Sequence, residues 1–167
     1  RIRHKYRLKN TTGLSLNSLV DFEDPIDILT HLMVGSEGTL GFVSAVTYNT
    51  VPEYPDKATA LLVFRNAETC CRAASALRSQ PVAAVELLDR RSLRSVQDKP
   101  GLPDWIHDLS EDACALLVET RAPSSESLDE QLARISASLA DFPLEQQVDF
   151  TRDAKVSDQL WAIRKGT

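Results

Sequence analysis

Apolar residues in the second part of the chain follow two different periods in turn. Four short runs have the continuous or alternating apolar pattern of β-strands: residues 57–64, 82–87, 113–119 and 145–150. Four further segments are predicted to be helices. In residues 67–79 and 128–139 apolar residues recur three and four positions apart, a third helix follows Asp89 and reaches about Val96, and residues 153–164 form a last helix that carries Leu160 and Trp161. Strand and helix therefore alternate four times, which predicts an α+β domain of the ferredoxin-like type, with a sheet covered by helices. The pattern does not give the order of the strands in that sheet.

Two of these helices carry specific signals. One has a continuous apolar stripe made of Leu128, Leu132, Ile135 and Leu139. The other is preceded by Asp89, which can cap it, because a carboxylate at that position accepts hydrogen bonds from the free N–H groups of the first turn. Both signals strengthen the helical assignment of their segments.

In the first part of the chain, a helix is predicted from residue 25. Asp24 is suited to the capping position and Pro25 to the first helical position. The apolar residues that follow recur at helical spacing: Ile26, Leu29, Leu32 and Met33. Gly35 is suited to end the helix, since glycine adopts the left-handed conformation found there.

A β segment and a linker follow this helix. Residues 39–51 are rich in β-branched and aromatic side chains, which predicts a strand. The run Pro52-Glu53-Tyr54-Pro55 then interrupts regular structure and indicates a linker. We therefore expect one domain over residues 1–54 and a second over residues 55–167.

The first nine residues alternate basic side chains with others. One interpretation is a solvated edge strand, which is the usual role of a run of charges. The other is a basic strip near an anionic cofactor.

Composition and charge exclude several classes of protein. The 167 residues are 43% apolar and 26% charged, as in ordinary globular domains, and the net charge of -5 argues against a nucleic-acid partner. No apolar run approaches the roughly 20 residues of a membrane span. Three cysteines, two of them adjacent, give neither a disulfide framework nor a C-x-x-C metal motif. These features predict a cytoplasmic protein without a metal site in this chain.

The stretch with the clearest chemical potential is Gly35-Ser36-Glu37-Gly38-Thr39-Leu40-Gly41. Three glycines in seven residues leave backbone N–H groups uncovered, so the loop can approach a pyrophosphate or a sugar closely. Ser36 and Thr39 add hydroxyl donors, and Glu37 can accept from a ribose or a ring amine. The alternative is a plain turn that needs glycine for its shape. The order of helix, loop and strand excludes a Rossmann fingerprint, and no Gly-Lys-Ser/Thr sequence makes it a P-loop.

This loop and its flanks, Leu32 to Val43, resemble the FAD-contacting stretch of the FAD-linked oxidase family, the flavoproteins of vanillyl-alcohol-oxidase type. Lys9 to Leu16 is similar to a second FAD-lining segment of that family, with Leu14 where tyrosine is usual. The runs Ile2 to Gly13 and Ala84 to Arg90 are most similar to the large FAD/iron–sulfur proteins of D-2-hydroxyglutarate dehydrogenase type, which are D-lactate dehydrogenase-like.

The resemblance implies a specific organisation. The chain corresponds to a middle fragment of such a protein: residues 1–54 to the C-terminal part of the FAD-binding domain, and residues 55–167 to the first part of the substrate or cap domain. The absence of an initial Met and an end inside a predicted helix favour the same expectation, with a short protein trimmed at both ends as the alternative. We expect these 167 residues alone to be inactive and to hold little FAD.

The resemblance also implies the residues of the site. Those expected to contact FAD are Asn10, Thr11, Gly13, Gly35, Ser36, Glu37, Gly38, Thr39, Leu40, Gly41 and Val43. The family's Trp-x-x-Arg sequence matches Trp161 to Arg164, and its arginine binds the substrate carboxylate, as a guanidinium does well. The alternative is that Arg164 is a residue of the last helical turn, favoured there by the helix dipole. The family's metal-binding and catalytic histidines are not expected among His4, His31 and His107.

The implied activity is oxidation of a D-2-hydroxy acid, of the 2-hydroxyglutarate or lactate type, by hydride transfer to the flavin of FAD. Electrons are then expected to leave through an iron–sulfur cluster in a further C-terminal domain, or to another acceptor. Two other functions stay open: a non-catalytic ferredoxin-like binding module, and an alcohol oxidase of the same fold.

Overall fold

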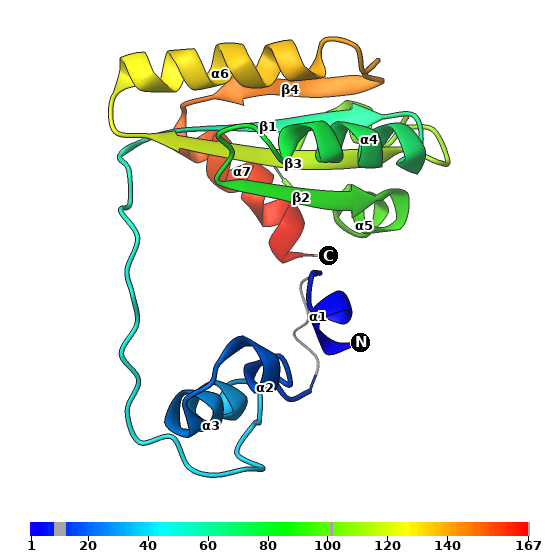
Figure 1. Ribbon diagram of the computed structural model, residues 1–167. Coiled ribbons are helices and arrows are strands. Elements are labelled where there is room, and N and C mark those ends of the chain that lie inside the picture. The colour runs from blue at the N-terminus through cyan, green and yellow to red at the C-terminus, as the bar shows by residue number, and fades with distance from the viewer. Residues whose placement is uncertain (9–12, 101, 167) are drawn as a thin grey trace. The chain divides into compact units, whose positions relative to one another are not determined.

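The computed structural model describes residues 1–8, 13–100 and 102–166 (Figure 1). The chain divides into two compact units, Arg1–Val51 and Pro52–Thr167.

The described residues of the first unit form three helices: α1 (Ile2–Lys5), α2 (Ser18–Asp21) and α3 (Pro25–Met33). Arg3 and Lys5 therefore lie on a short helix, and the interpretation of this stretch as an edge strand was wrong. The capping prediction for α3 is confirmed, because Asp24 Oδ1 accepts from the N–H groups of Ile26 at 2.8 Å and Asp27 at 3.2 Å. The helix ends as expected, with Gly35 at a φ of 81°.

Residues 39–51 do not form the strand that their composition predicts. Their apolar side chains are exposed, with Phe42 91% and Tyr48 80% accessible. A strand requires a hydrogen-bonding partner, and the described residues of this unit include no other strand. Residues 39–51 contain side chains that favour β structure, but no strand in the described part of the unit is present to pair with them.

The second unit is built on a four-stranded antiparallel sheet: β1 (Asp56–Phe64), β2 (Ala84–Asp89), β3 (Cys114–Ala122) and β4 (Gln146–Thr151). The strands lie in the order β2-β3-β1-β4. This order, with β1 and β3 in the middle, is that of a ferredoxin-like fold, and α5 (Arg90–Val96) between β2 and β3 is an addition to its β-α-β-β-α-β pattern. The predicted α+β class is confirmed, and the structure supplies the strand order that the sequence pattern did not give.

The helices of this unit are α4 (Ala67–Leu77), α5 (Arg90–Val96), α6 (Ser125–Leu139) and α7 (Ala154–Lys165), with a 3-10 turn, η1, at Asp104–Ile106. Each α-helix begins after a side chain that accepts hydrogen bonds from its first turn: Asn66, Asp89, Ser124 and Asp153. The predicted cap of Asp89 is confirmed, with its Oδ1 2.7 Å from the nitrogen of Ser92.

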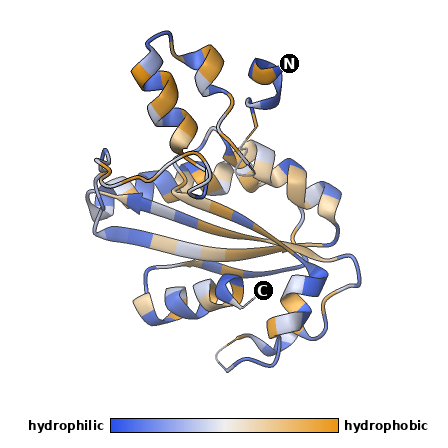
Figure 2. Cartoon of the chain, turned by 90° about the horizontal axis from the view of Figure 1, so that it is seen from below, coloured by the Kyte–Doolittle hydropathy of each residue, from blue (hydrophilic) through white to orange (hydrophobic). Residues whose placement is uncertain are grey.

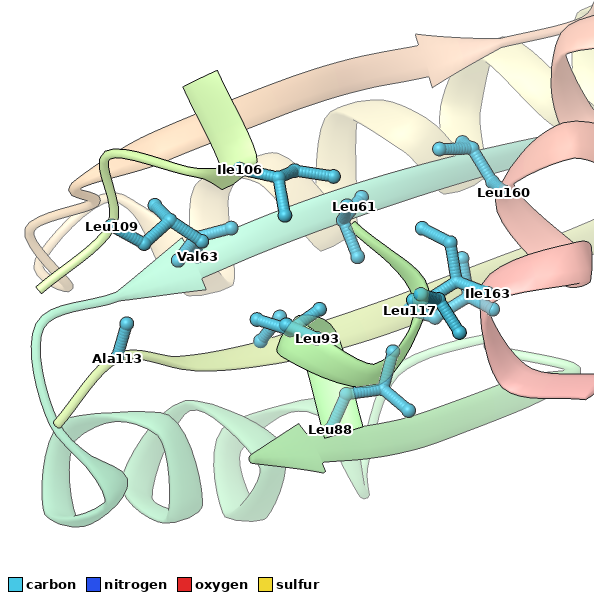
Figure 3. Close-up of a cluster of buried hydrophobic side chains, with 12 residues drawn as sticks. Leu61, Val63, Leu88, Leu93, Ile106, Leu109, Ala113, Leu117, Leu160 and Ile163 are labelled. Carbon is cyan, nitrogen blue, oxygen red and sulfur yellow. The ribbon is translucent and has the colours of Figure 1, made fainter. Parts of the chain in front are cut away.

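The two central strands are buried on both faces, so the sheet lies between two layers of helices (Figure 2). One face of β1 and β3 packs against α4 and α6 in a cluster that includes Leu62, Leu116, Leu77 and Ile135. The opposite face packs against α5, η1 and α7 in a second cluster, whose side chains converge in Figure 3; it includes Leu61, Leu117, Leu93 and Ile163. Because alternate residues of a strand point to opposite faces, continuous apolar runs suit strands covered in this way.

Candidate functional site

The first unit brings together the two segments that the sequence associates with FAD. A Cβ atom added to Gly35 would lie 2.9 Å from the carbonyl oxygen of Gly13, closer than side-chain carbons approach backbone. The hydroxyl of Ser15 also donates to the carbonyl of Val34 at 2.8 Å. The start of the glycine-rich loop is therefore held against the segment that begins at Gly13, and only glycine fits at position 35.

The loop itself is a series of tight turns. Glu37 and Gly38 both have positive φ values, 51° and 79°. Ser36 is buried, and its carbonyl accepts from the backbone N–H of Thr39 at 2.9 Å and from the Thr39 hydroxyl at 2.6 Å. The Thr39 hydroxyl proton is thus used inside the loop, which leaves its oxygen lone pairs for a ligand.

The surface of the loop is open to a ligand. Glu37, Gly38 and Thr39 are exposed, and nothing lies within 4 Å of a Cβ built on Gly38. Gly41 packs on the Met33 side chain, whereas Leu40 and Val43 are about half exposed. Uncovered backbone with positive φ is the chemistry of an anion nest, so these residues fit the phosphate and sugar parts of FAD.

An apolar hollow of about 950 Å³ lies in the same unit. Its lining comes from α3 and from the extended segment after the loop, including Leu29, Met33, Leu40, Phe42 and Tyr48. Asn10 and Thr11, the remaining residues expected to contact FAD, lie outside the described residues.

Arg164, the residue expected to bind a carboxylate, lies in the last turn of α7 in the second unit. Its guanidinium is half exposed, and Nε donates to Oε2 of Glu86 at 3.0 Å. Glu86 belongs to β2, and its side chain is 39% exposed. The arrangement presents a half-exposed cation, and the contact with Glu86 helps to orient its guanidinium.

A buried polar cluster lies beneath α7. It includes Trp161, which precedes Arg164 by three residues. Glu119 on β3 is only 2% exposed. Its Oε2 accepts from the indole Nε1 of Trp161 at 2.7 Å and from the hydroxyl of Thr59 at 3.3 Å, and its Oε1 accepts from Nε of Arg121 at 2.7 Å. The Thr59 hydroxyl in turn lies 2.7 Å from that of Ser157 on α7.

Sequence reasoning did not assign a role to either acid that contacts α7. Glu86 appeared only within a stretch that resembles the family, and Glu119 only at the end of a predicted strand. A usable signal was present for Glu119, because a carboxylate that ends a buried apolar run requires partners.

The cysteines have structural environments. All three are free thiols; Cys70 and Cys114 are buried and Cys71 is exposed. Burial raises the pKa of both Cys70 and Cys114 above its ordinary value. A thiol held in its neutral form is a poor nucleophile, so these two belong to the core rather than to a reactive site.

Two further properties bear on the sequence-based expectations. Within the described residues, no three His, Cys, Asp or Glu side chains gather closely enough to hold a metal ion. Among the helices that the structure describes, none combines the length and the apolar character that crossing a membrane requires.

Comparison with known proteins matches residues 54–167 to the family model described as "FAD linked oxidases, C-terminal domain". The chain is also similar to the glycolate oxidase subunit GlcD of Bacillus subtilis (strain 168), with 32% identity over 113 residues. That alignment covers 65% of this chain and 23% of GlcD, so the chain corresponds to less than a quarter of its relative's length.

Proposed function

This chain belongs to the family of FAD linked oxidases, and from that membership we propose that it is part of an FAD-dependent oxidoreductase that oxidises a 2-hydroxy acid. The proposed substrates are of the D-2-hydroxyglutarate or lactate type. The similarity to a glycolate oxidase subunit supports this class, since glycolate is itself a 2-hydroxy acid. The single observation that carries the proposal is Arg164, a half-exposed cation oriented by Glu86 on a helix of the matched domain.

The glycine-rich loop is proposed to hold FAD. Exposed backbone at Glu37 and Gly38 suits the phosphate groups of the cofactor. The Thr39 hydroxyl oxygen, whose proton is donated within the loop, can accept a hydrogen bond from a sugar hydroxyl. Because position 35 is glycine, the loop can approach the carbonyl of Gly13 closely, which brings the two segments proposed to contact FAD together. When bound, FAD supplies the ring system that accepts a hydride from the substrate.

Arg164 is proposed to bind the carboxylate of the hydroxy acid. A guanidinium keeps its charge at all physiological pH values and binds a carboxylate through two parallel hydrogen bonds, which fixes orientation as well as affinity. Glu86 accepts from Nε, so this acid on β2 helps to orient the guanidinium that is proposed to bind the substrate. Fixing the carboxylate limits the directions in which the C2 hydrogen can point, and correct orientation is a large part of catalysis.

The remaining expectations also enter as proposals. Residues 1–54 are assigned to the C-terminal part of an FAD-binding domain, and residues 55–167 to the first part of the substrate domain. The electrons are proposed to leave through an iron–sulfur cluster carried elsewhere in the complete protein, or to another acceptor. The complete protein is proposed to be cytoplasmic.

The proposal is tested by replacing Arg164 with alanine in the complete, FAD-loaded protein. We expect KM for D-2-hydroxy acids to rise and kcat/KM to fall by about 100-fold or more, because loss of an orienting contact is costly. Arg94→Ala is the matched control: Arg94 also lies in the last turn of a helix and pairs with an acid, Glu111. Its kinetics should equal those of wild type.

Substrate discrimination gives a second measurement from the same variants. Wild type should strongly prefer a 2-hydroxy acid to its uncharged amide, and Arg164→Ala should lose that preference, because the amide cannot pair with a guanidinium charge. Unchanged KM and kcat in Arg164→Ala would refute the assigned role.

A further inference from the structure

The structure assigns Glu119 as a positioning residue, which acts on the substrate carboxylate by fixing α7 and thereby Arg164. This inference rests on the proposed function of Arg164. Glu119 is itself buried, and its hydrogen-bond partners among the described residues belong to its own unit.

Glu119 is a buried carboxylate. Its side chain is 3% exposed, within a strand whose neighbouring residues are also buried. Removing a carboxylate from water is expensive, and the cost is met only when charged or strong donors surround it. Here three donors do so, and Arg121 is the one among them that carries charge.

The donors connect the sheet to one helix. Trp161 donates to Glu119 at 2.7 Å, and one turn earlier Ser157 shares a hydrogen bond of 2.7 Å with Thr59. Residues four apart lie on the same side of a helix, so both contacts face the sheet. The apolar contacts of Leu160 and Ile163 are not directional, whereas two hydrogen bonds one turn apart fix both rotation and position along the axis.

Arg164 follows Trp161 by three residues. That spacing is about 4.5 Å along the helix and about 60° around it, so any rotation or shift at Trp161 is transmitted directly to Arg164. Rotation by even a few tens of degrees would move a long side chain on the helix surface away from a fixed ligand.

The acids that hold Trp161 and Arg164 lie on one face of the sheet. Glu86 on β2 is opposite Leu117 on β3, and Glu119 follows Leu117 by two residues, so both carboxylates point to the α7 side. The helix α7 therefore contacts two acids on neighbouring strands. The buried acid, Glu119, accepts from Trp161, and the half-exposed acid, Glu86, accepts from Arg164. Through this support, Glu119 acts together with Glu86 in fixing the position of the guanidinium.

The test uses Glu119→Gln in the complete, FAD-loaded protein. The probe is 2-hydroxyisobutyrate, a 2-hydroxy acid with a methyl group in place of the C2 hydrogen, so that it binds without being oxidised. Its Kd, followed by the flavin absorbance well below the unfolding temperature, should rise by about 10-fold or more, since small misplacements of a positioning group are costly.

The control is Glu145→Gln. Glu145 is also a carboxylate that accepts two hydrogen bonds, and both come from Ser110, from its backbone N–H and its hydroxyl, rather than from α7. This variant should bind the probe as wild type does. If Glu119 had a merely structural role, Glu119→Gln would also bind the probe with the wild-type Kd and would show only a lower Tm.

Combining substitutions separates an effect through Arg164 from an independent one. In an Arg164→Ala background, Glu119→Gln should weaken probe binding by no more than about 2-fold, because the group it positions is already absent. If Glu119→Gln does not fold, Trp161→Phe replaces it, since this change removes the indole donor and leaves Glu119 with Arg121 and Thr59.

The outcomes distinguish the two claims. Normal probe binding by Arg164→Ala overturns the proposed function. Weak binding by Arg164→Ala together with normal binding by Glu119→Gln, or by Trp161→Phe where that variant is used, overturns the positioning role alone. The positioning role is also overturned if the losses of probe affinity caused by Arg164→Ala and by Glu119→Gln add fully in the double variant.

Discussion

At the scale of single residues, burial decides what a polar or ionisable side chain does. Asp89 is exposed and caps a helix, and the hydrogen bond from Ser92 lowers the pKa of its carboxyl. Glu86 is partly exposed and orients one arginine. Glu119 is buried and ties two strands to a helix. In this one unit a carboxylate therefore caps a helix, orients a surface arginine or joins strands to a helix, according to how deeply it is buried.

Thiol reactivity is a prediction at this scale. Because burial raises the pKa of Cys70 and Cys114, both remain protonated and enclosed at pH 8, whereas Cys71 is exposed. Iodoacetamide should therefore modify Cys71 alone in the native protein and all three thiols after unfolding, because the thiolate is the nucleophile. Peptide mass mapping checks this. Modification of Cys70 as fast as Cys71 would contradict the buried environment.

At the scale of elements, packed segments were predictable from the sequence and unpacked ones were not. The stripe at Leu128 and Ile135 became the buried face of α6, since helical periodicity records which side meets the core. The strand predicted at 113–119 is longer than expected and continues to Ala122, where it still pairs with β1. The strand predicted at 39–51 is absent because β propensity records compatibility with a sheet, not the presence of one.

The candidate site divides in the same way. Local sequence predicted the turn at Gly35 and the location of Arg164 on a terminal helix, because both depend on neighbours in the chain. The contacts of Arg164 and Trp161 with Glu86 and Glu119 depend on strand order, which the sequence pattern did not contain.

The glycine loop supports a prediction with an internal control. Gly35 and Gly38 have nearly equal positive φ values, so alanine at either costs roughly 1–2 kcal/mol in backbone conformation. Only at Gly35 would the new Cβ also meet the Gly13 carbonyl, at 2.9 Å. Gly35→Ala should therefore lower the melting temperature (Tm) of the FAD-free protein more than Gly38→Ala does. Equal Tm values in both variants would show that the contact with Gly13 is unimportant for the stability of the loop.

At the scale of the whole molecule, the two predicted parts of the site lie in different units. The loop expected to contact FAD belongs to residues 1–51, and Arg164 belongs to residues 52–167. The family match covers residues 54–167, and the alignment with GlcD accounts for 23% of that relative. The proposed oxidation needs both FAD and the substrate, so it has to be measured in the complete protein.

The most direct measurement is the absorption spectrum of the complete protein under anaerobic conditions, before and after addition of a D-2-hydroxy acid. The account predicts a flavin spectrum that is bleached by the acid, with the Arg164→Ala variant bleached far more slowly at the same acid concentration. A protein that carries no flavin, or whose flavin is unchanged by D-2-hydroxyglutarate, D-lactate and glycolate alike, would contradict it.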